Sequence, residues 1–119
     1  MVTHVYKLLN AFPEDEKFGL TSQIKRSSIS ISSNIAEGYG RNYTKDYSRF
    51  LNIARGSLFE MQTQFQIAQN LNFINENDLT TINDLSVEIE KMLNSLINKL
   101  NKSLQITNAF LLITNLLKC

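Results

Sequence analysis

The fold is decided by residues 47–68, which read YSRFLNIARGSLFEMQTQFQIA. Within this stretch, apolar or small side chains recur at spacings of 4, 3, 4, 3, 4 and 3, at Tyr47, Leu51, Ala54, Leu58, Met61, Phe65 and Ala68. This spacing places them on one face of an α-helix, and its persistence over three heptads is typical of a helix that packs lengthwise on other helices. Phe50 and Ile67 widen the stripe to the breadth found in a globular bundle. We therefore expect a helix over about residues 44–71, with Thr44 as its N-cap.

A second stripe of the same kind follows in residues 78–103. Its members are Leu79, Ile82, Ser86, Ile89, Leu93, Leu96 and Leu100. Asp78 is expected to cap this helix, because its carboxylate suits the positive end of the helix dipole. A shorter apolar face in residues 1–12 predicts a first helix that ends before Pro13.

Residues 18–38 are ambiguous by pattern. From Ser28 to Ser32 serine and isoleucine alternate, which is typical of a strand. Over a longer window the spacing is instead three or four, at Leu20, Ile24, Ser27, Ile31 and Ile35. A lone strand in a helical chain would leave its edges unpaired, so we predict a helix with Gly38 at its C′ position. The four segments together predict an all-α, antiparallel up-down-up-down four-helix bundle with a shortened first helix.

Length and composition exclude several classes of protein. The chain has 119 residues, of which 43% are hydrophobic and 19% charged, so it has the size of one domain and differs from a disordered chain. Cys119 is the one cysteine, which excludes an intramolecular disulfide. No stretch reaches the roughly 18 apolar residues of a membrane span, and the N-terminus lacks a signal-peptide pattern. We expect a cytoplasmic protein that does not contact a membrane.

The C-terminal stretch has an unusual composition. Residues 103–117 carry no charged side chain and are rich in leucine and isoleucine. We expect a bundle over residues 1–103, followed over residues 104–119 by an apolar C-terminal tail or an extension of the fourth helix.

Three blocks of sequence carry a resemblance to a known family. They are FGLTSQIKRSS at residues 18–28, SNIAEGYGR at 33–41 and FLNIARGSLFE at 50–60. These blocks resemble the small four-helix-bundle proteins encoded within 23S rRNA intervening sequences of bacteria, whose fold is similar to that of the accessory protein of diversity-generating retroelements. The resemblance covers roughly residues 5–102. It implies a homo-oligomer, a pentamer in the form of a ring, and a reverse-transcriptase-like protein as one candidate partner.

The sequence departs from that family at both ends. Family members usually begin further before the position of Val5, so the first helix looks shortened here, and the tail is not part of the family pattern. In an up-down-up-down bundle the end of the fourth helix lies near the start of the first. We therefore expect the tail to fold back over the surface that the missing turns would cover, through Phe110, Leu111, Ile113 and Leu116.

Residues suited to catalysis are sparse. His4 is the one histidine, and the sequence contains no Glu-x-x-His pair, zinc-ligand spacing or phosphate-binding glycine-rich motif. We expect no enzyme activity, no cofactor and no metal. Asn34, Glu37 and Glu60 are expected to form a structural polar network with neighbouring basic residues, because a carboxylate between helices must be paired. Gly56 is expected to allow two helices to approach closely.

Basic residues gather in the middle of the sequence. Residues 17–55 hold seven basic side chains and two acidic ones, although the net charge of the whole chain is +1. Because the second and third helices are antiparallel neighbours, residues on both sides of their connection meet at one end of the bundle. Aromatic faces beside arginines suit unpaired bases. The candidate nucleic-acid-binding residues are Lys25, Arg26, Tyr39, Arg41, Tyr43, Lys45 and Arg49.

The sequence thus predicts a non-enzymatic, self-associating bundle that binds RNA or other nucleic acid through a basic end. One alternative is a purely structural bundle, a degenerate passenger of a mobile element with no affinity for nucleic acid. Another is a small-molecule enzyme, which would need a polar cavity built from Asn34, Glu37 and Glu60.

Overall fold

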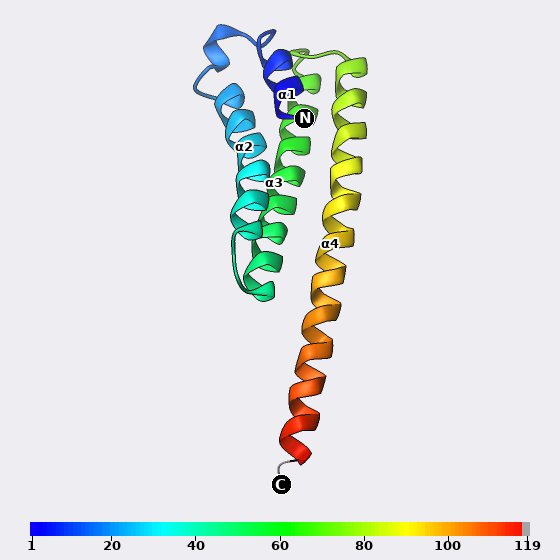
Figure 1. Cartoon of the computed structure of the whole chain (residues 1–119). Helices are drawn as coiled ribbons and strands as arrows, with labels where there is room; N and C mark the ends of the chain where they lie inside the picture. Colours follow the sequence, from blue (N-terminus) through cyan, green and yellow to red (C-terminus); the bar gives the residue numbers. More distant parts are fainter. Residues whose placement is uncertain (118–119) are drawn as a thin grey trace.

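The computed structural model describes residues 1–117, and it describes their side chains over residues 1–103 and 112–117. The elements in this range are all helical: α1 (Val2–Leu9), the short 3-10 helix η1 (Glu14–Glu16), α2 (Leu20–Tyr39), α3 (Thr44–Asn70) and α4 (Glu76–Leu117). Figure 1 shows α2, α3 and α4 running antiparallel to their neighbours in sequence, with the short α1 beside their upper half. The predicted all-α bundle with a short first helix is confirmed.

The core is built on α3, whose predicted stripe is buried. Its fully buried members are Leu51, Ala54, Leu58, Met61, Phe65 and Ala68, and Tyr47 packs against them partly buried. Ile24 and Ile31 of α2 close over one side of α3, and Ile82 and Leu93 of α4 are buried with them. Each large apolar side chain of this kind contributes about 1.5–3 kcal/mol when it is fully buried. The stripe therefore holds the three long helices together.

The segment with the ambiguous pattern is helical. Ile24, Ser27 and Ile31 of α2 are buried, as helical spacing requires. The hydroxyl oxygens of Ser30 on α2 and Ser57 on α3 lie 2.8 Å apart, which shows how closely the small side chains let the two helices approach. The prediction of a helix rather than a strand is confirmed.

Both predicted N-caps are wrong. Thr44 is the first residue of α3 and Tyr43 precedes it at the cap position, where no side chain caps the helix. Helix α4 begins at Glu76, two residues before Asp78. The Asp78 backbone N–H donates to Asn75 Oδ1 at 2.7 Å, and the Asn75 N–H donates to Asp78 Oδ2 at 3.4 Å. This reciprocal capping box makes Asn75 the cap and Asp78 the third residue of the helix.

The roles predicted for two glycines are also wrong. Gly38 lies inside α2, which ends at Tyr39, and not beyond its C-terminus. A Cβ atom at Gly38 would lie 2.9 Å from Phe50 Cβ and 2.9 Å from Tyr47 Cδ2, whereas a Cβ atom at Gly56 would meet nothing within 4 Å. The close approach of two helices therefore depends on Gly38, where α2 crosses the start of α3, and not on Gly56.

Helix α4 continues to Leu117, well past the end of the other helices (Figure 1). Ile113 and Leu116 are exposed on this extension, so the predicted fold-back is wrong for them. The physical reason is that residues 103–117 contain neither proline nor glycine, so nothing in the sequence interrupts the helix. The side chains of Phe110 and Leu111 lie outside the described ones, as does Cys119. No helix in the described range is long and apolar enough to cross a membrane.

Alanine substitutions at the two glycines distinguish their roles. Gly38→Ala is expected to lower the free energy of unfolding by about 1–3 kcal/mol, because the new methyl group overpacks the contact with α3. Gly56→Ala is expected to raise it by about 0.5–1 kcal/mol, because alanine is the better helix former and the space around it is open. Denaturant unfolding measures both changes, and effects of the same sign would contradict the assignment.

Ser86 interrupts the apolar stripe of α4, and its buried hydroxyl has no hydrogen-bond partner. Ser86→Ala is expected to raise the free energy of unfolding by about 1 kcal/mol, because it removes a buried polar group that is not satisfied. Ser27→Ala is the matched control. The Ser27 hydroxyl is equally buried but donates to Gln64 Oε1 at 2.7 Å, so its loss should destabilise the protein by a similar amount. Urea unfolding of the two variants should therefore give midpoints shifted in opposite directions.

Candidate nucleic-acid interface

Three exposed cations lie in the connection between α2 and α3 or at the start of α3, and we call them the basic end: Arg41, Lys45 and Arg49. Arg41 comes two residues after the end of α2, and the other two lie in the first two turns of α3. The N-terminus of α3 adds the positive pole of its helix dipole at the same place, where Asp46 is the acidic residue of the first turn. The local fold thus brings these cations together as the sequence predicts.

Two arginines of the basic end are held against one aromatic ring. The guanidinium carbon of Arg41 lies 4.9 Å from the centroid of the Phe50 ring, and that of Arg49 lies 4.6 Å from it. Arg41 also pairs with Glu37 at 2.6 Å, and Arg49 lies 4.0 Å from Asp46. Cation–π contacts restrain a guanidinium while its edge keeps N–H donors for a ligand. The basic end therefore presents two oriented guanidinium groups whose positive charge is partly neutralised by nearby carboxylates.

Two tyrosines flank these arginines. Tyr39 is 79% exposed and Tyr43 is 73% exposed. The ring of Tyr39 meets the ring of Tyr47 in an edge contact, with centroids 6.3 Å apart and planes at 77°. Large exposed rings next to cations can stack on the unpaired bases of a nucleic acid. The geometry therefore combines cationic and aromatic groups within one turn and the helix ends beside it.

Lys25 and Arg26 lie elsewhere. The Lys25 Nζ atom is 5.4 Å from the centroid of the Tyr6 ring of α1, and Arg26 forms an ion pair with Glu60 of α3. At 1.5 Å per residue, Arg26 is about 20 Å from Arg41 along the axis of α2. The structure therefore does not bring Lys25 and Arg26 into the basic end.

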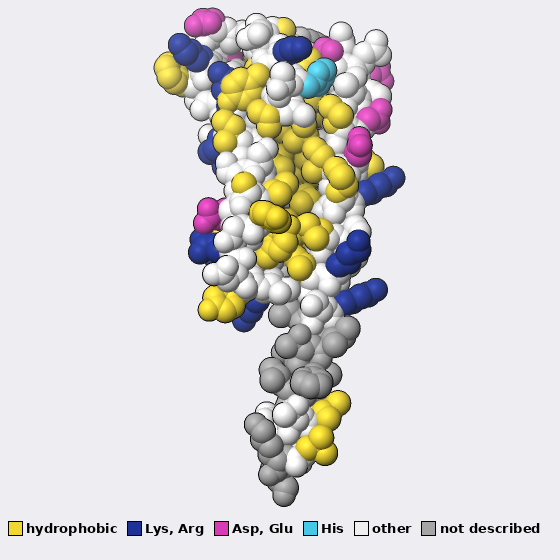
Figure 2. All heavy atoms as spheres, viewed as in Figure 1, with side chains coloured by type: hydrophobic (Ala, Val, Ile, Leu, Met, Phe, Trp, Pro, Cys, Tyr) yellow, Lys and Arg dark blue, Asp and Glu magenta, His cyan; other side chains and the backbone are white. Residues whose placement is uncertain are grey.

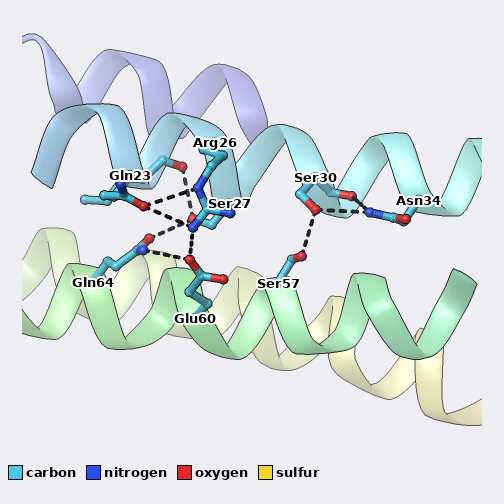
Figure 3. A network of polar contacts seen from close by, with 9 residues as sticks. Gln23, Arg26, Ser27, Ser30, Asn34, Ser57, Glu60 and Gln64 are labelled. Atoms are coloured by element: carbon cyan, nitrogen blue, oxygen red, sulfur yellow. Dashed lines mark hydrogen bonds and ion pairs between the residues drawn. The ribbon is translucent and has the colours of Figure 1, made fainter. Parts of the chain in front are cut away.

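Asn34, Glu37 and Glu60 also lie in separate places. Asn34 Nδ2 donates to the carbonyl of Ser30 at 2.8 Å and to its hydroxyl at 3.0 Å, and the same hydroxyl meets that of Ser57 (Figure 3). Glu37 pairs with an arginine of the basic end, as described above. Each of the three residues has different partners, so their side chains do not converge on one polar pocket of the kind that a small-molecule enzyme would need.

Glu60 belongs to a second polar cluster that joins α2 to α3. Gln64 Nε2 and Arg26 both donate to its carboxylate, and Gln64 Oε1 accepts a hydrogen bond from buried Ser27 (Figure 3). Arg26 also donates to Gln23. Because each charged group has an opposite charge or a donor beside it, the cluster is a structural link between two helices.

Charge is distributed unequally along the bundle. The half near the α2–α3 connection, residues 30–58 and 91–117, holds seven basic side chains and two acidic ones, whereas residues 1–29 and 59–90 hold four basic and nine acidic. Figure 2 shows carboxylates on the upper part of α4 and lysines below them. The basic end therefore lies in the positive half of a polarised molecule, which favours the approach of an anion to that half.

Lys99 and Lys102 of α4 add to this positive half. They flank Asn101, whose Oδ1 accepts a hydrogen bond from Ser48 Oγ of α3 at 3.2 Å, so they are level with the start of α3. Both are exposed. Charge counted along the chain misses them, because they are far from the basic end in sequence. Aligning the apolar stripes of α3 and α4 as antiparallel neighbours would have placed both lysines level with the basic end.

Groups that could support catalysis are scarce in the described part of the chain. Its side chains form no cluster of three or more His, Cys, Asp or Glu residues that could hold a metal ion. His4 is partly buried on α1, and its Nε2 atom has no hydrogen-bond partner.

The chain is similar to known proteins over most of its length. The family model of the 23S rRNA-intervening sequence protein matches residues 1–95. The fold is also similar to a crystal structure from Bacteroides thetaiotaomicron VPI-5482, of a protein of unknown function from the S23 ribosomal protein family. The two structures superpose with a TM-score of 0.71 at 31% sequence identity, and the match covers 81% of this chain and 87% of that one. No curated protein matches. The match to the family model includes α1, α2 and α3 and stops within α4, before its extension. On this evidence the chain belongs to the 23S rRNA-intervening sequence protein family.

Proposed function

We propose that the protein is a non-enzymatic interaction protein that binds RNA through its basic end. The observation that carries this proposal is the pair of guanidinium groups of Arg41 and Arg49 on the Phe50 ring, together with the exposed Tyr39 and Tyr43 of the same connection. Oriented guanidinium groups bind phosphates, and exposed rings stack on bases that are not paired. The favoured ligand is therefore RNA with a single-stranded loop. Lys25 and Arg26 are left out, because they lie toward the other end of α2.

One basic end alone would bind weakly, because its three cations face two carboxylates nearby. Self-association would present several such ends to one RNA molecule and raise the overall affinity without any new contact. The ring of subunits implied by the family resemblance is one such assembly. The exposed apolar side chains Ile53, Phe59 and Ile67 on α3, with Gly56 among them, support the proposal that α3 carries a contact between subunits.

The basic end can be tested by titrating the protein with a stem-loop RNA at several salt concentrations. We expect the logarithm of the affinity to fall steeply with the logarithm of salt, and we expect Arg41→Ala and Arg49→Ala each to weaken binding and to reduce that slope by about 0.7–0.9 per lost phosphate contact. Lys25→Ala is the matched control, since it removes the same charge at a distance from the basic end. Absence of binding at low salt would favour the purely structural alternative.

Base stacking gives a different signature. Tyr39→Leu and Tyr43→Leu are each expected to weaken binding to the same RNA by about 1–3 kcal/mol if one base stacks on each ring. The salt slope should not change, because no charge is removed. Tyr6→Leu on α1 serves as the control for loss of a tyrosine away from the basic end. If both variants at the basic end bind like the unmodified protein, the two rings take no part in recognition.

A further inference from the structure

Arg55 of α3 differs from the other arginines of the chain in its partners. The other three, Arg26, Arg41 and Arg49, each lie within 4.0 Å of a carboxylate. Among the side chains that the structure describes, no carboxylate forms an ion pair with Arg55. The positive charge of this half-buried guanidinium is therefore not neutralised by a neighbour.

Two side-chain amides hold the Arg55 guanidinium at the seam between α3 and α4. Its Nη1 atom donates to Asn94 Oδ1 of α4 at 2.8 Å, and its Nη2 atom donates to Asn52 Oδ1 of α3 at 2.7 Å. Asn52 is fixed in turn, because its Nδ2 atom donates to the carbonyl of Ser48 at 2.9 Å. Amide oxygens are neutral, so they orient the guanidinium and leave its charge and its remaining N–H donors to a ligand.

This seam lies close to the basic end. Arg55 is six residues after Arg49, which is about 9 Å along α3. That separation is within the roughly 10 Å over which charges act on one another at 0.1 M salt. On α4, Glu90 lies one turn before Asn94, and it forms no ion pair with Arg55 among the described side chains.

Two lysines of α4 flank the same seam. Lys91 is three residues before Asn94 and Lys102 is eight residues after it, so all three lie along one side of the helix. Both lysines are exposed, and residues 91–117 contain no acidic side chain. The surroundings of Arg55 on α4 are therefore positive on both sides along the helix.

We propose that Arg55, positioned by Asn52 and Asn94, binds a phosphate group of the RNA backbone. The RNA then continues from the basic end across the start of α3 to the seam with α4, so this inference rests on the proposed function. A guanidinium suits this role because two of its N–H groups can donate to two phosphate oxygens at once. Lys91 and Lys102 add attraction as point charges. Contacts to phosphate fix the position of the RNA and carry no sequence information.

The side of α3 that carries Arg55 differs from most of the surface proposed above for a contact between subunits. Ile53 and Ile67 lie about 160° and 120° away from Arg55 around the helix. Phe59, one turn further from the basic end, is the nearest of those apolar side chains. A loss of RNA binding is therefore assigned to Arg55 only where light scattering shows an unchanged mass of the protein.

Asn94→Asp tests the proposal, because it places beside Arg55 the carboxylate that the other arginines have. We expect the melting temperature to be kept or raised by the new ion pair. Binding of a stem-loop RNA, measured by fluorescence anisotropy, should weaken about tenfold, and its salt slope should fall by about 0.7–0.9 for one lost phosphate contact. Asn83→Asp is the matched control: it makes the same change on α4 about 16 Å away and should bind nearly as the unmodified protein does.

Variants of Arg55 itself separate charge from geometry. Arg55→Gln should weaken binding and lower the salt slope as Asn94→Asp does, whereas Arg55→Lys should weaken binding with the slope kept, because it retains the charge and loses the paired donors. Unchanged binding in Asn94→Asp, or an equal loss in Asn94→Asp and Asn83→Asp, would overturn this proposal. If Arg41→Ala still weakens binding in that case, the basic end stands alone, whereas absence of RNA binding by the unmodified protein overturns both proposals.

Discussion

The buried stripe of α3 is the contact on which the other features of the molecule depend. Its side chains face two neighbours, so α2 and α4 must both lie along α3, and hydrogen bonds from Ser57 to α2 and from Ser48 to α4 mark the level at which each pairs with it. Once these levels are set, the ends of the helices are set as well. The connection between α2 and α3, the start of α3 and residues 99–102 of α4 then lie at one end of the bundle, although they are distant in sequence.

Local periodicity was sufficient to predict the fold, because the burial of each stripe depends only on spacing within its own helix. It was insufficient wherever the outcome depends on a neighbouring helix or on competition between adjacent residues. Gly38 and Gly56 are both glycines within helices, and the positions of Tyr47 and Phe50 across the interface distinguish them. Asn75 and Asp78 are both good capping residues, and their mutual hydrogen bonds decide which one is the cap. An extension of the fourth helix was one of the two predicted alternatives for residues 104–119, and the fold-back was wrong because it assumed contacts with other helices that the local pattern does not determine.

The candidate site could likewise be predicted from local sequence only in part. Tyr39, Arg41, Tyr43, Lys45 and Arg49 lie within eleven consecutive residues around one turn, so a local argument places them together. Lys25 and Arg26 are on the same helix as Tyr39, but helical rise carries them toward its other end, where Arg26 pairs with Glu60. Lys102 is distant in sequence from the basic end, and the antiparallel pairing of α3 with α4 brings it level with that end.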